Sequence, residues 1–577
     1  MKKLVSILLC AALLFGTVAI GTHASEDEIK WDGDPVVFLQ GFTGSPFVMD
    51  RGLETETGIW GAGAEFDAAR IVAAVPPILI GLVSYILGGD SGLLVSGIDY
   101  LVSDKLGKMA CNPDGTSKHN VTPYPYYAEE ASIATLKAND KADFVPEQEI
   151  NGDIAAYVPE EYIYIFNTDW RLGQIDNSER LAEFIDDVLE ITGKSKVDIY
   201  ALSHGGQTAA AYLYYHGEEG KVDNALLDVP AIGGTSIVKG LLGLGAANFD
   251  MDEISRFAGV LLNTEADLRW LGKILPGEFL NELLKIVFVE CFQPYAMNFG
   301  SIWDFMDVAS YTEFKEIYLN PLTNYEMIVK HDKMHYDCMA NMSKGLKAAE
   351  DAGANIYILA NYGTQLGSGE AIDADFVIDT TCSSGAYTAE FGKQLPADYK
   401  QKNTTCTDPT HNHISPDRTV DASCAYLPEK TWFIRGQYHG MIVRDNYTRP
   451  MITRMLLTDT IKDVHSNPAY PQFELSQNPI DAIYAKFANE TSGFYNADSK
   501  ALVVRNLSNE YSITLKSVVA EGCEFTVDKK AVIAPGEEIE IPCTKLSGSN
   551  IKVEITYARQ GQLLSAPFTR TVYFCAK

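Results

Sequence analysis

An apolar run passes into a serine and then into a helix-like sequence at Val197-Asp198-Ile199-Tyr200-Ala201-Leu202-Ser203-His204-Gly205-Gly206-Gln207. Residues 208–215 continue the helical character, so the order predicts a strand, a tight turn and a helix. A serine at such a turn stands clear of the sheet, with its hydroxyl exposed and the next backbone N–H groups directed toward it. Gly205 leaves room where the helix crosses the strand. The stretch therefore predicts that Ser203 is a nucleophile rather than part of an ordinary turn.

Five further apolar runs are spaced along the chain, with helix-like sequence between several of them. They lie at 35–39, 162–166, 225–229, 355–359 and 431–434. Their near-continuous apolar character is typical of parallel strands that are covered on both faces. Ahead of the serine strand, apolar residues from Leu181 to Leu189 recur at helical spacing behind an expected cap at Asp176 or Asn177. We therefore expect an α/β fold with a mostly parallel sheet, whose sites form at the carboxyl ends of strands.

Two regions interrupt this alternation, and a third follows it. Residues 58–130 contain an uncharged stretch at 71–89, which is short and proline-broken for a membrane span, so no integral span is expected. Residues 236–340 are helical in character and aromatic, and they stand where a cap over the site would be inserted. From about residue 500 the pattern turns to short alternating strands, which predicts a β-sandwich. The expected organisation is a signal peptide at 1–24, a catalytic domain at 25–470, a connector at 471–499 and a sandwich module at 500–577.

A serine hydroxyl is a weak nucleophile, and it needs a base, an orienting acid and N–H donors for the oxyanion. The donors are expected from the residue after the serine and from the loop after the first strand, Gln40-Gly41-Phe42-Thr43-Gly44-Ser45. Gly41 permits a sharp turn there. The N–H of Phe42 can then meet the N–H of His204 at the oxyanion, while the His204 side chain points away.

These motifs resemble those of secreted bacterial lipases with an α/β-hydrolase fold. The loop at 40–45 resembles the His-Gly-Phe-x-Gly loop of lipases, with Gln40 in place of the histidine. Residues 169–171 resemble the Tyr-Asp-Trp-Arg segment of the lecithin:cholesterol acyltransferase-like lipases, and residues 202–206 resemble their His-Ser-Met-Gly-Gly. Residues 231–235 are similar to the segment that follows the serine turn in that family. The resemblance covers roughly residues 34–465 and implies an α/β-hydrolase fold with cap insertions and an esterase activity on lipids.

The base is expected late in the chain. In α/β-hydrolases the acid and then the histidine follow the serine. His439 comes directly after the last apolar run and is therefore the expected base. His411 and His413 precede that run and are less favoured.

The acid is expected after the strand that ends at Leu359. Asp373, Asp375 and Asp379 are the candidates. Asp375 is favoured because its Asp-x-β-branched-β-branched pattern is similar to the turn after that strand in many lipases.

The expected function is hydrolysis of carboxylic esters, lipids above all, through Ser203, Asp375, His439 and an acyl-enzyme. An acyltransferase is an alternative, because only the acceptor that reaches the acyl-enzyme would differ. A peptidase of the same fold and a non-catalytic surface or binding protein on a hydrolase scaffold are further alternatives. No cofactor and no metal is expected. His411 or His413 with Asp417 could hold a structural metal, but a solvated loop is the favoured interpretation.

The start of the chain has the pattern of a secretory signal. Lys2 and Lys3 form the basic part, residues 4–20 the apolar part, and Thr22-His23-Ala24 the cleavage site. We expect the mature protein to start near Ser25 and to be extracellular.

Charge and cysteine usage fit export. The formal net charge of −31 argues against binding to nucleic acid or an anionic surface through bulk charge. The expected partners are an ester or lipid substrate and a lipid interface, as the resemblance to lipases implies. The sequence gives no indication of the oligomeric state. Removal of Cys10 with the leader leaves an odd number of cysteines, so at least one is free or pairs between chains. Cys406 and Cys424 could close one loop, and two of the last three cysteines could staple the C-terminal module.

Overall fold

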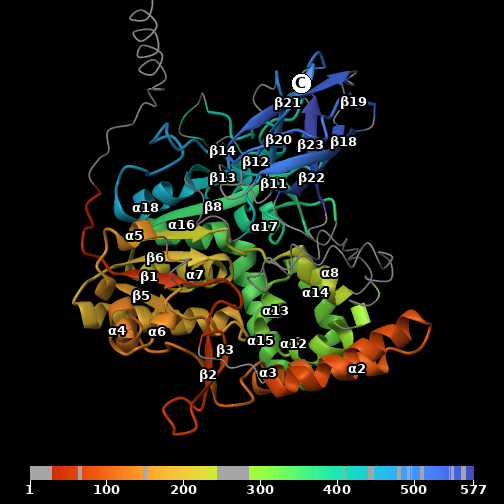
Figure 1. Ribbon diagram of the computed structural model, residues 1–577. Helices are drawn as coiled ribbons and strands as arrows, with labels where there is room; N and C mark the ends of the chain where they lie inside the picture. The colour runs from red at the N-terminus through yellow and green to blue at the C-terminus, as the bar shows by residue number, and fades with distance from the viewer. Residues whose placement is uncertain are drawn as a thin grey trace, which may run out of the picture.

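A parallel sheet forms the centre of the computed structural model (Figure 1). The structure describes residues 29–62, 68–146, 152–243, 288–367, 370–396, 398–403, 411–439, 447–476 and most of 483–576, with single positions between these ranges. The expected signal peptide and residues 244–281 of the expected cap lie outside the described residues.

The central sheet has seven strands in the order β14-β13-β8-β7-β6-β1-β5, and every neighbouring pair is parallel. The strands are β1 (Val36–Leu39), β5 (Ile163–Phe166), β6 (Val197–Leu202), β7 (Val222–Asp228), β8 (Asn355–Tyr362), β13 (Thr431–Arg435) and β14 (Phe473–Leu475). The first six of these strands coincide with the six predicted apolar runs. Their carboxyl ends lie at one edge of the sheet, so the segments that follow β6, β8 and β13 can meet there.

Helices cover both faces of the sheet, which explains why the strands are apolar without alternation. Val37 and Leu39 face one layer, whereas Val36 and Phe38 face the other. The first layer holds α6 (Gln174–Thr192), α7 (Ser203–His216) and α16 (Met342–Asp351), and the second holds α4 (Ile133–Ala138), α5 (Gly152–Ala155) and α18 (Thr448–Leu457). The predicted α/β fold class is confirmed.

Helix α6 begins differently from the expectation. Gly173 is its N-cap, rather than Asp176 or Asn177. The carboxylate of Asp304, far along the chain, accepts a hydrogen bond from the backbone N–H of Gln174 at 2.6 Å. A tertiary contact therefore replaces the local cap that the sequence suggested.

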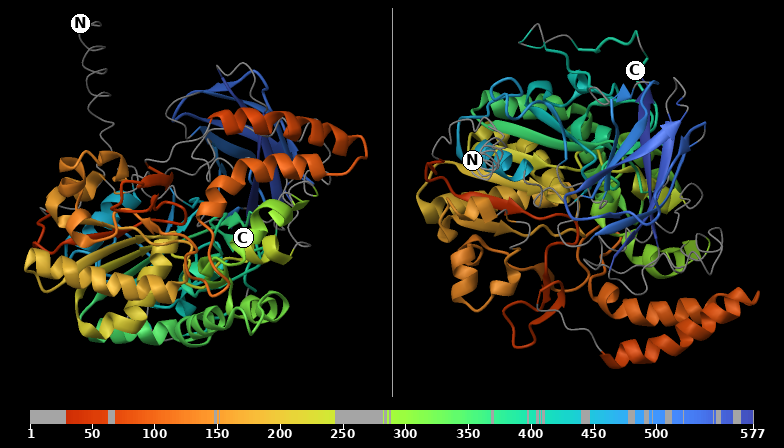
Figure 2. Two further views of the ribbon diagram at one scale, coloured as in Figure 1. Left: turned by 90° about the horizontal axis from the view of Figure 1, so that it is seen from below. Right: turned by 45° about the horizontal axis from the view of Figure 1, so that its top comes forward.

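The insertion after β1 contains a small antiparallel sheet and a long helical hairpin. Strands β2 (Phe47–Met49), β3 (Thr57–Trp60) and β4 (Val121–Pro123) form the sheet, and α2 (Ala68–Ile86) and α3 (Gly92–Lys108) form the hairpin. Figure 2 shows the hairpin projecting from the body of the molecule. Among the described helices, none combines the length and apolarity of a membrane span.

A buried ion pair fastens this insertion to the sheet. Arg171 is fully buried and forms a bidentate pair with Asp169, with N···O distances of 2.9 and 2.6 Å. Its guanidinium also donates to the backbone carbonyls of Met109 and Val121 and to Ser117 Oγ. Every donor of this buried charge is directed to a partner, which is the condition under which such a charge is tolerated.

The described part of the expected cap is helical and packed into the body. Its helices are α8 (Ser236–Gly243), α12 (Gln293–Ala296), α13 (Gly300–Asp304), α14 (Val308–Tyr318) and α15 (Tyr325–Lys333). Trp303, Phe305 and Tyr311 are buried in one cluster, and Met334 and Cys338 join the core on the α7 side of the sheet. Between β8 and β13 lie α17 (Thr380–Ser384) and the short strands β9 (Thr364–Gln365), β10 (Asp373–Ala374), β11 (Tyr387–Thr388) and β12 (Val420–Asp421).

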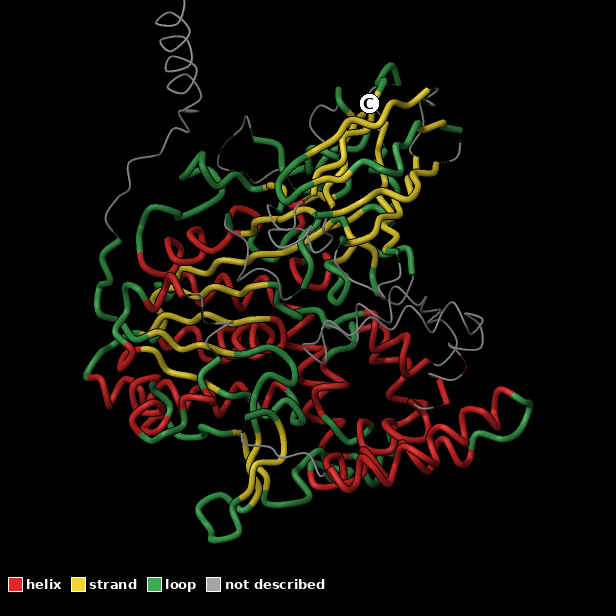
Figure 3. The backbone as a smooth tube through the Cα atoms, viewed as in Figure 1, coloured by secondary structure: helices red, strands yellow, loops and turns green. Residues whose placement is uncertain are grey.

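The C-terminal part forms two sheets that enclose their own apolar core (Figure 3). One sheet has the order β15-β17-β21-β19 and the other β16-β23-β22-β18-β20. The strands are β15 (Ile483–Phe487), β16 (Phe494–Tyr495), β17 (Ala501–Asn506), β18 (Ile513–Ala520), β19 (Glu524–Phe525), β20 (Val532–Ile533), β21 (Glu538–Thr544), β22 (Ile551–Arg559) and β23 (Phe568–Ala576). The stretch expected as a connector therefore contains β14, which joins the central sheet, and two strands of this module.

The suggested disulfide between Cys406 and Cys424 is not formed, and both cysteines are free. The sulfur of Cys406 contacts histidine side chains, whereas the sulfur of Cys424 lies 3.9 Å from Asp421 Oδ2. In the C-terminal module, Cys543 is also a free cysteine.

Candidate active site

Ser203 occupies a strained turn between β6 and α7. Its φ angle is 52°, a left-handed conformation that is uncommon for a residue with a side chain. A Cβ atom on Gly205 would lie 2.6 Å from the carbonyl oxygen of Gln40, so no other residue fits where α7 crosses the sheet. The turn has the geometry of a nucleophile elbow, and Ser203 itself stays partly exposed at the carboxyl edge of the sheet.

The structure brings three of the predicted site residues together at this edge. His439 Nε2 lies 2.9 Å from Ser203 Oγ, and His439 Nδ1 lies 2.7 Å from Asp375 Oδ2. A carboxylate only accepts hydrogen bonds, so Nδ1 carries the hydrogen and Nε2 accepts the hydrogen bond of the serine hydroxyl. This tautomer leaves the imidazole ready to take a proton from Ser203.

The carboxylate of Asp375 is held in place by the backbone that follows it. Its Oδ1 accepts hydrogen bonds from the N–H groups of Val377 at 2.9 Å and Ile378 at 2.7 Å. The backbone N–H of His439 also donates to the carbonyl oxygen of Asp375. The acid is therefore oriented independently of the histidine side chain, and it leaves one oxygen for Nδ1.

The two alternative acids have other partners. Asp373 accepts hydrogen bonds from Thr380 Oγ1 and from the N–H of Gly363, and burial raises its pKa to about 7. Asp379 accepts from both the hydroxyl and the N–H of Ser236. Neither carboxylate reaches His439.

A fourth carboxyl group near the site has no counterpart in the sequence analysis. Asp228 ends β7, opposite Leu202 of β6, and is fully buried. Burial raises its pKa well above the usual range, and its Oδ2 accepts a hydrogen bond from the Tyr200 hydroxyl at 3.2 Å. Burial therefore disfavours the charged form of this carboxyl, which is the form that stabilises an imidazolium. The one sequence signal for Asp228 is its position at the end of the strand that follows the Ser203 segment.

The loop after β1 passes close to the serine. A Cβ atom on Gly41 would lie 3.5 Å from Ser203 Cβ, so this loop lines the space above the hydroxyl. Phe42 follows directly, and His204 supplies one of the first N–H groups of α7, which have no acceptor within the helix. Both N–H groups expected at the oxyanion thus belong to segments that adjoin Ser203.

The side chains of these two residues pack against each other. The His204 ring is fully buried, with its Nδ1 3.3 Å from Thr168 Oγ1, and burial lowers its pKa to about 4. The Phe42 ring packs edge-on against Trp170, His204 and Phe305. The neutral His204 ring therefore supports the loop and faces away from the reacting atoms, while its backbone stays at the site.

Buried polar side chains join the elbow helix to the cap. Gln207 Nε2 donates to the carbonyl of Asp304, and Gln174 Nε2 donates to Gln207 Oε1. The carboxylate of Asp304 lies 2.6 Å from His331 Nδ1, and both groups are buried. The cap around α13 and α15 is therefore fixed to the elbow helix by hydrogen bonds. This network could not be predicted from the sequence, because residues that are bonded in it lie up to 130 positions apart.

The remaining predicted residues lie elsewhere. His411 and His413 are not near Ser203, and Asp417 pairs with Arg435 at 3.0 Å rather than with either histidine. Gln40, which replaces a histidine of the lipase loop, is buried and donates to Asn167 Oδ1 at 2.7 Å.

Comparison with known proteins adds little to this geometry. No family model matches the chain, and no curated protein matches it. The phospholipase PlaB from Legionella pneumophila is similar at 9% identity and a TM-score of 0.30, over 74% of this chain and 87% of that chain. The same phospholipase in complex with thio-NAD gives 10% identity and a TM-score of 0.28, over 75% and 87%. These scores are too low to transfer any property to this chain.

Proposed function

We propose that this protein is a serine hydrolase that cleaves carboxylic esters, with lipids as its substrates. The observation that carries the proposal is the chain of two hydrogen bonds from Ser203 through His439 to Asp375, built on a left-handed serine turn. A structural serine needs neither the strained backbone nor a histidine that is oriented by a carboxylate.

The reaction follows from these positions. Ser203 Oγ attacks the acyl carbon while its proton moves to His439 Nε2, and Asp375 stabilises the imidazolium. The oxyanion accepts hydrogen bonds from the N–H groups of Phe42 and His204. His439 then gives the proton to the departing alcohol, which leaves an acyl-enzyme. Water attacks the acyl-enzyme by the same steps in reverse, and a carboxylic acid and free Ser203 result.

The lipid assignment rests on the α2–α3 hairpin and on the sequence resemblance to lipases. The hairpin exposes several large apolar side chains, among them Val72, Leu79, Ile80, Val83 and Leu87, which are 55–81% accessible. A concentrated exposed apolar surface on an acidic protein is typical of a contact site for apolar partners. We infer that this hairpin rests on the surface of aggregated lipid.

The described part of the cap is not assigned to lipid contact. Its aromatic side chains are buried, and its polar network is joined to α7. We infer that this part is a fixed wall of the site, so contact with lipid falls to the hairpin. We also infer export, from the pattern of residues 1–24; the N-terminal sequence of the mature protein tests it, with Ser25 expected and an intact Met1 contradicting it.

The test is hydrolysis of a panel of acyl esters and glycerophospholipids by the wild type and by the Ser203→Ala variant. The wild type should release fatty acid, and the variant should lose on the order of 10³-fold or more in kcat, with the residual rate due to the oxyanion donors and binding. The variant should keep its thermal stability, because alanine meets the same backbone strain as serine. Equal turnover by both proteins would overturn the assignment.

A further inference from the structure

Five metal-binding side chains gather at the end of the sheet opposite to Ser203. Cys406, His411 and His413 form one group of three, and Cys406, Glu429 and His465 form another; within each group the ligand atoms lie within 4.8 Å of one another. Glu429 immediately precedes β13, whereas His439 follows it. Five residues of strand separate the two ends by about 16 Å, so this cluster is distinct from the candidate active site.

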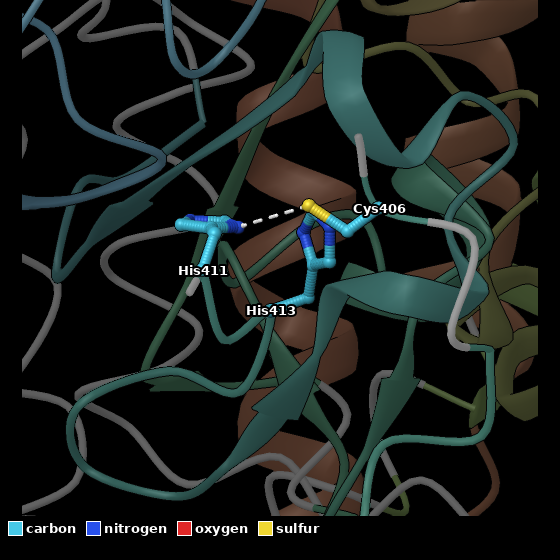
Figure 4. A group of neighbouring side chains, drawn as sticks. All are labelled: Cys406, His411 and His413. Carbon is cyan, nitrogen blue, oxygen red and sulfur yellow. Dashed lines mark hydrogen bonds between the residues drawn. The ribbon is translucent and has the colours of Figure 1, made fainter. Parts of the chain in front are cut away.

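Two distances from the sulfur of Cys406 fit a tetrahedral metal site. Cys406 Sγ lies 3.8 Å from His411 Nδ1 and 3.5 Å from His465 Nε2. In a tetrahedral zinc site, with bonds of about 2.3 Å to sulfur and about 2.0 Å to nitrogen, sulfur and nitrogen ligands are roughly 3.5 Å apart. Figure 4 shows the imidazoles of His411 and His413 converging on the sulfur of Cys406.

His413 supplies an independent observation. Its side chain is only 1% accessible, and its Nδ1 lies 2.8 Å from Gln472 Oε1. The amide of Gln472 is fixed the right way round, because its Nε2 donates to the carbonyls of Pro428 and Thr431. His413 Nδ1 must therefore be the donor, which leaves Nε2 with a lone pair and no hydrogen. This buried Nε2 has no hydrogen-bond partner in the described part of the chain.

A buried, unpaired imidazole nitrogen is costly unless something binds it. The hydrogen bond from Nδ1 to Gln472 is also the arrangement by which proteins orient a histidine toward a metal. We propose that Cys406, His411, His413 and His465 bind a zinc ion, with Glu429 beside it. One thiolate and one carboxylate then balance the charge of the ion, and sulfur with imidazole is the donor set that favours zinc over magnesium or calcium.

The zinc acts as a structural clamp. It joins Cys406, His411 and His413 to His465, which lies 59 positions after Cys406 and beyond α18, and places them beside the start of β13. Crosslinks of this kind stabilise a fold by binding the native state alone. An open cavity of about 500 Å³, lined partly by Cys406, His413 and Glu429, lets a chelator reach the ion. The sequence favoured a solvated loop here and offered Asp417 as a ligand. The proposed site uses Cys406 and His465 with the two histidines instead, while Asp417 pairs with Arg435.

The experiment measures the metal content of the full chain, expressed in medium with zinc and dialysed against metal-free buffer. The wild type should hold about one zinc per chain, and so should Ser203→Ala, because the site does not depend on the proposed hydrolase. Cys406→Ser and His413→Ala should lose the zinc. Cys424→Ser is the matched control, since this free cysteine contacts Asp421 instead, and it should keep the zinc.

A second measurement covers the case in which the variants fail to fold. A chelator should lower the Tm of the wild type, and added zinc should restore it. Cobalt in place of zinc should give the charge-transfer absorption of a cobalt–thiolate bond. The proposal would be overturned by a wild type that holds no stoichiometric zinc or whose Tm does not change with the chelator. It would also be overturned by a Cys406→Ser variant that holds as much zinc as the wild type.

Discussion

Asp375 is the residue whose role in the proposed mechanism depends most on geometry. Replacement by asparagine keeps the size of the side chain but lets it donate to His439 Nδ1, which favours the wrong tautomer and removes the charge that stabilises the imidazolium. We expect Asp375→Asn to lower kcat on a soluble ester by about 10²- to 10⁴-fold. Asp373→Asn is the matched control and should keep most of the activity, because Asp373 binds Thr380 and Gly363 instead. Comparable losses in both variants would count against Asp375 as the acid.

Single residues were predictable where their chemistry depends on chain order and local turns. The small residues around Ser203 pointed to the elbow, and His439 and Asp375 follow the strands whose carboxyl ends adjoin that turn. Asp228 was not predictable in the same way, because burial in the folded sheet is what raises its pKa. The zinc candidates illustrate the same limit: His411 and His413 are close in sequence, but Cys406, Glu429 and His465 join them only after folding.

We expect charges on the α2–α3 hairpin to weaken activity on aggregated lipid. Leu79→Glu with Val83→Glu places two charges on its exposed apolar face, so we expect at least a tenfold loss of activity on micelles or vesicles, on the order of the transfer free energy of two such side chains. Activity on a short soluble ester should not change. Leu322→Glu is the matched control, because Leu322 is 90% accessible but lies outside the hairpin, between α14 and α15 of the cap. A drop of equal size on both substrates, with a lower Tm, would mean that the hairpin is part of the core.

Six strands of the central sheet could be predicted from continuous apolar runs, since burial on both faces of a sheet requires that pattern. The start of α6 could not be predicted from the sequence, because an N–H group of its first turn donates to Asp304 of the cap. Strand β14 was also missed. It has three residues, lies at the sheet edge and pairs only with β13, so its sequence carries little of the apolar signal.

At the scale of the whole molecule, the C-terminal module has its own core and contributes none of the proposed catalytic residues. Because β15 pairs with β17, the boundary of the module lies before residue 483 rather than at 500. Truncation after β14, at residue 476, should therefore leave hydrolysis of a soluble ester unchanged. A truncated protein that is folded by circular dichroism but inactive on that ester would mean that the module completes the site.

Labelling by a fluorophosphonate shows whether Ser203 is an activated nucleophile, and it needs no knowledge of the substrate. Attack by Ser203 Oγ on phosphorus would leave a stable adduct, which mass spectrometry of the peptide that spans β6 and α7 can locate. We expect one adduct on Ser203 in the wild type, none in Ser203→Ala, and strongly slowed labelling in His439→Ala. A folded wild type that does not react, or one that carries its adduct on another residue, would show that Ser203 is not the nucleophile.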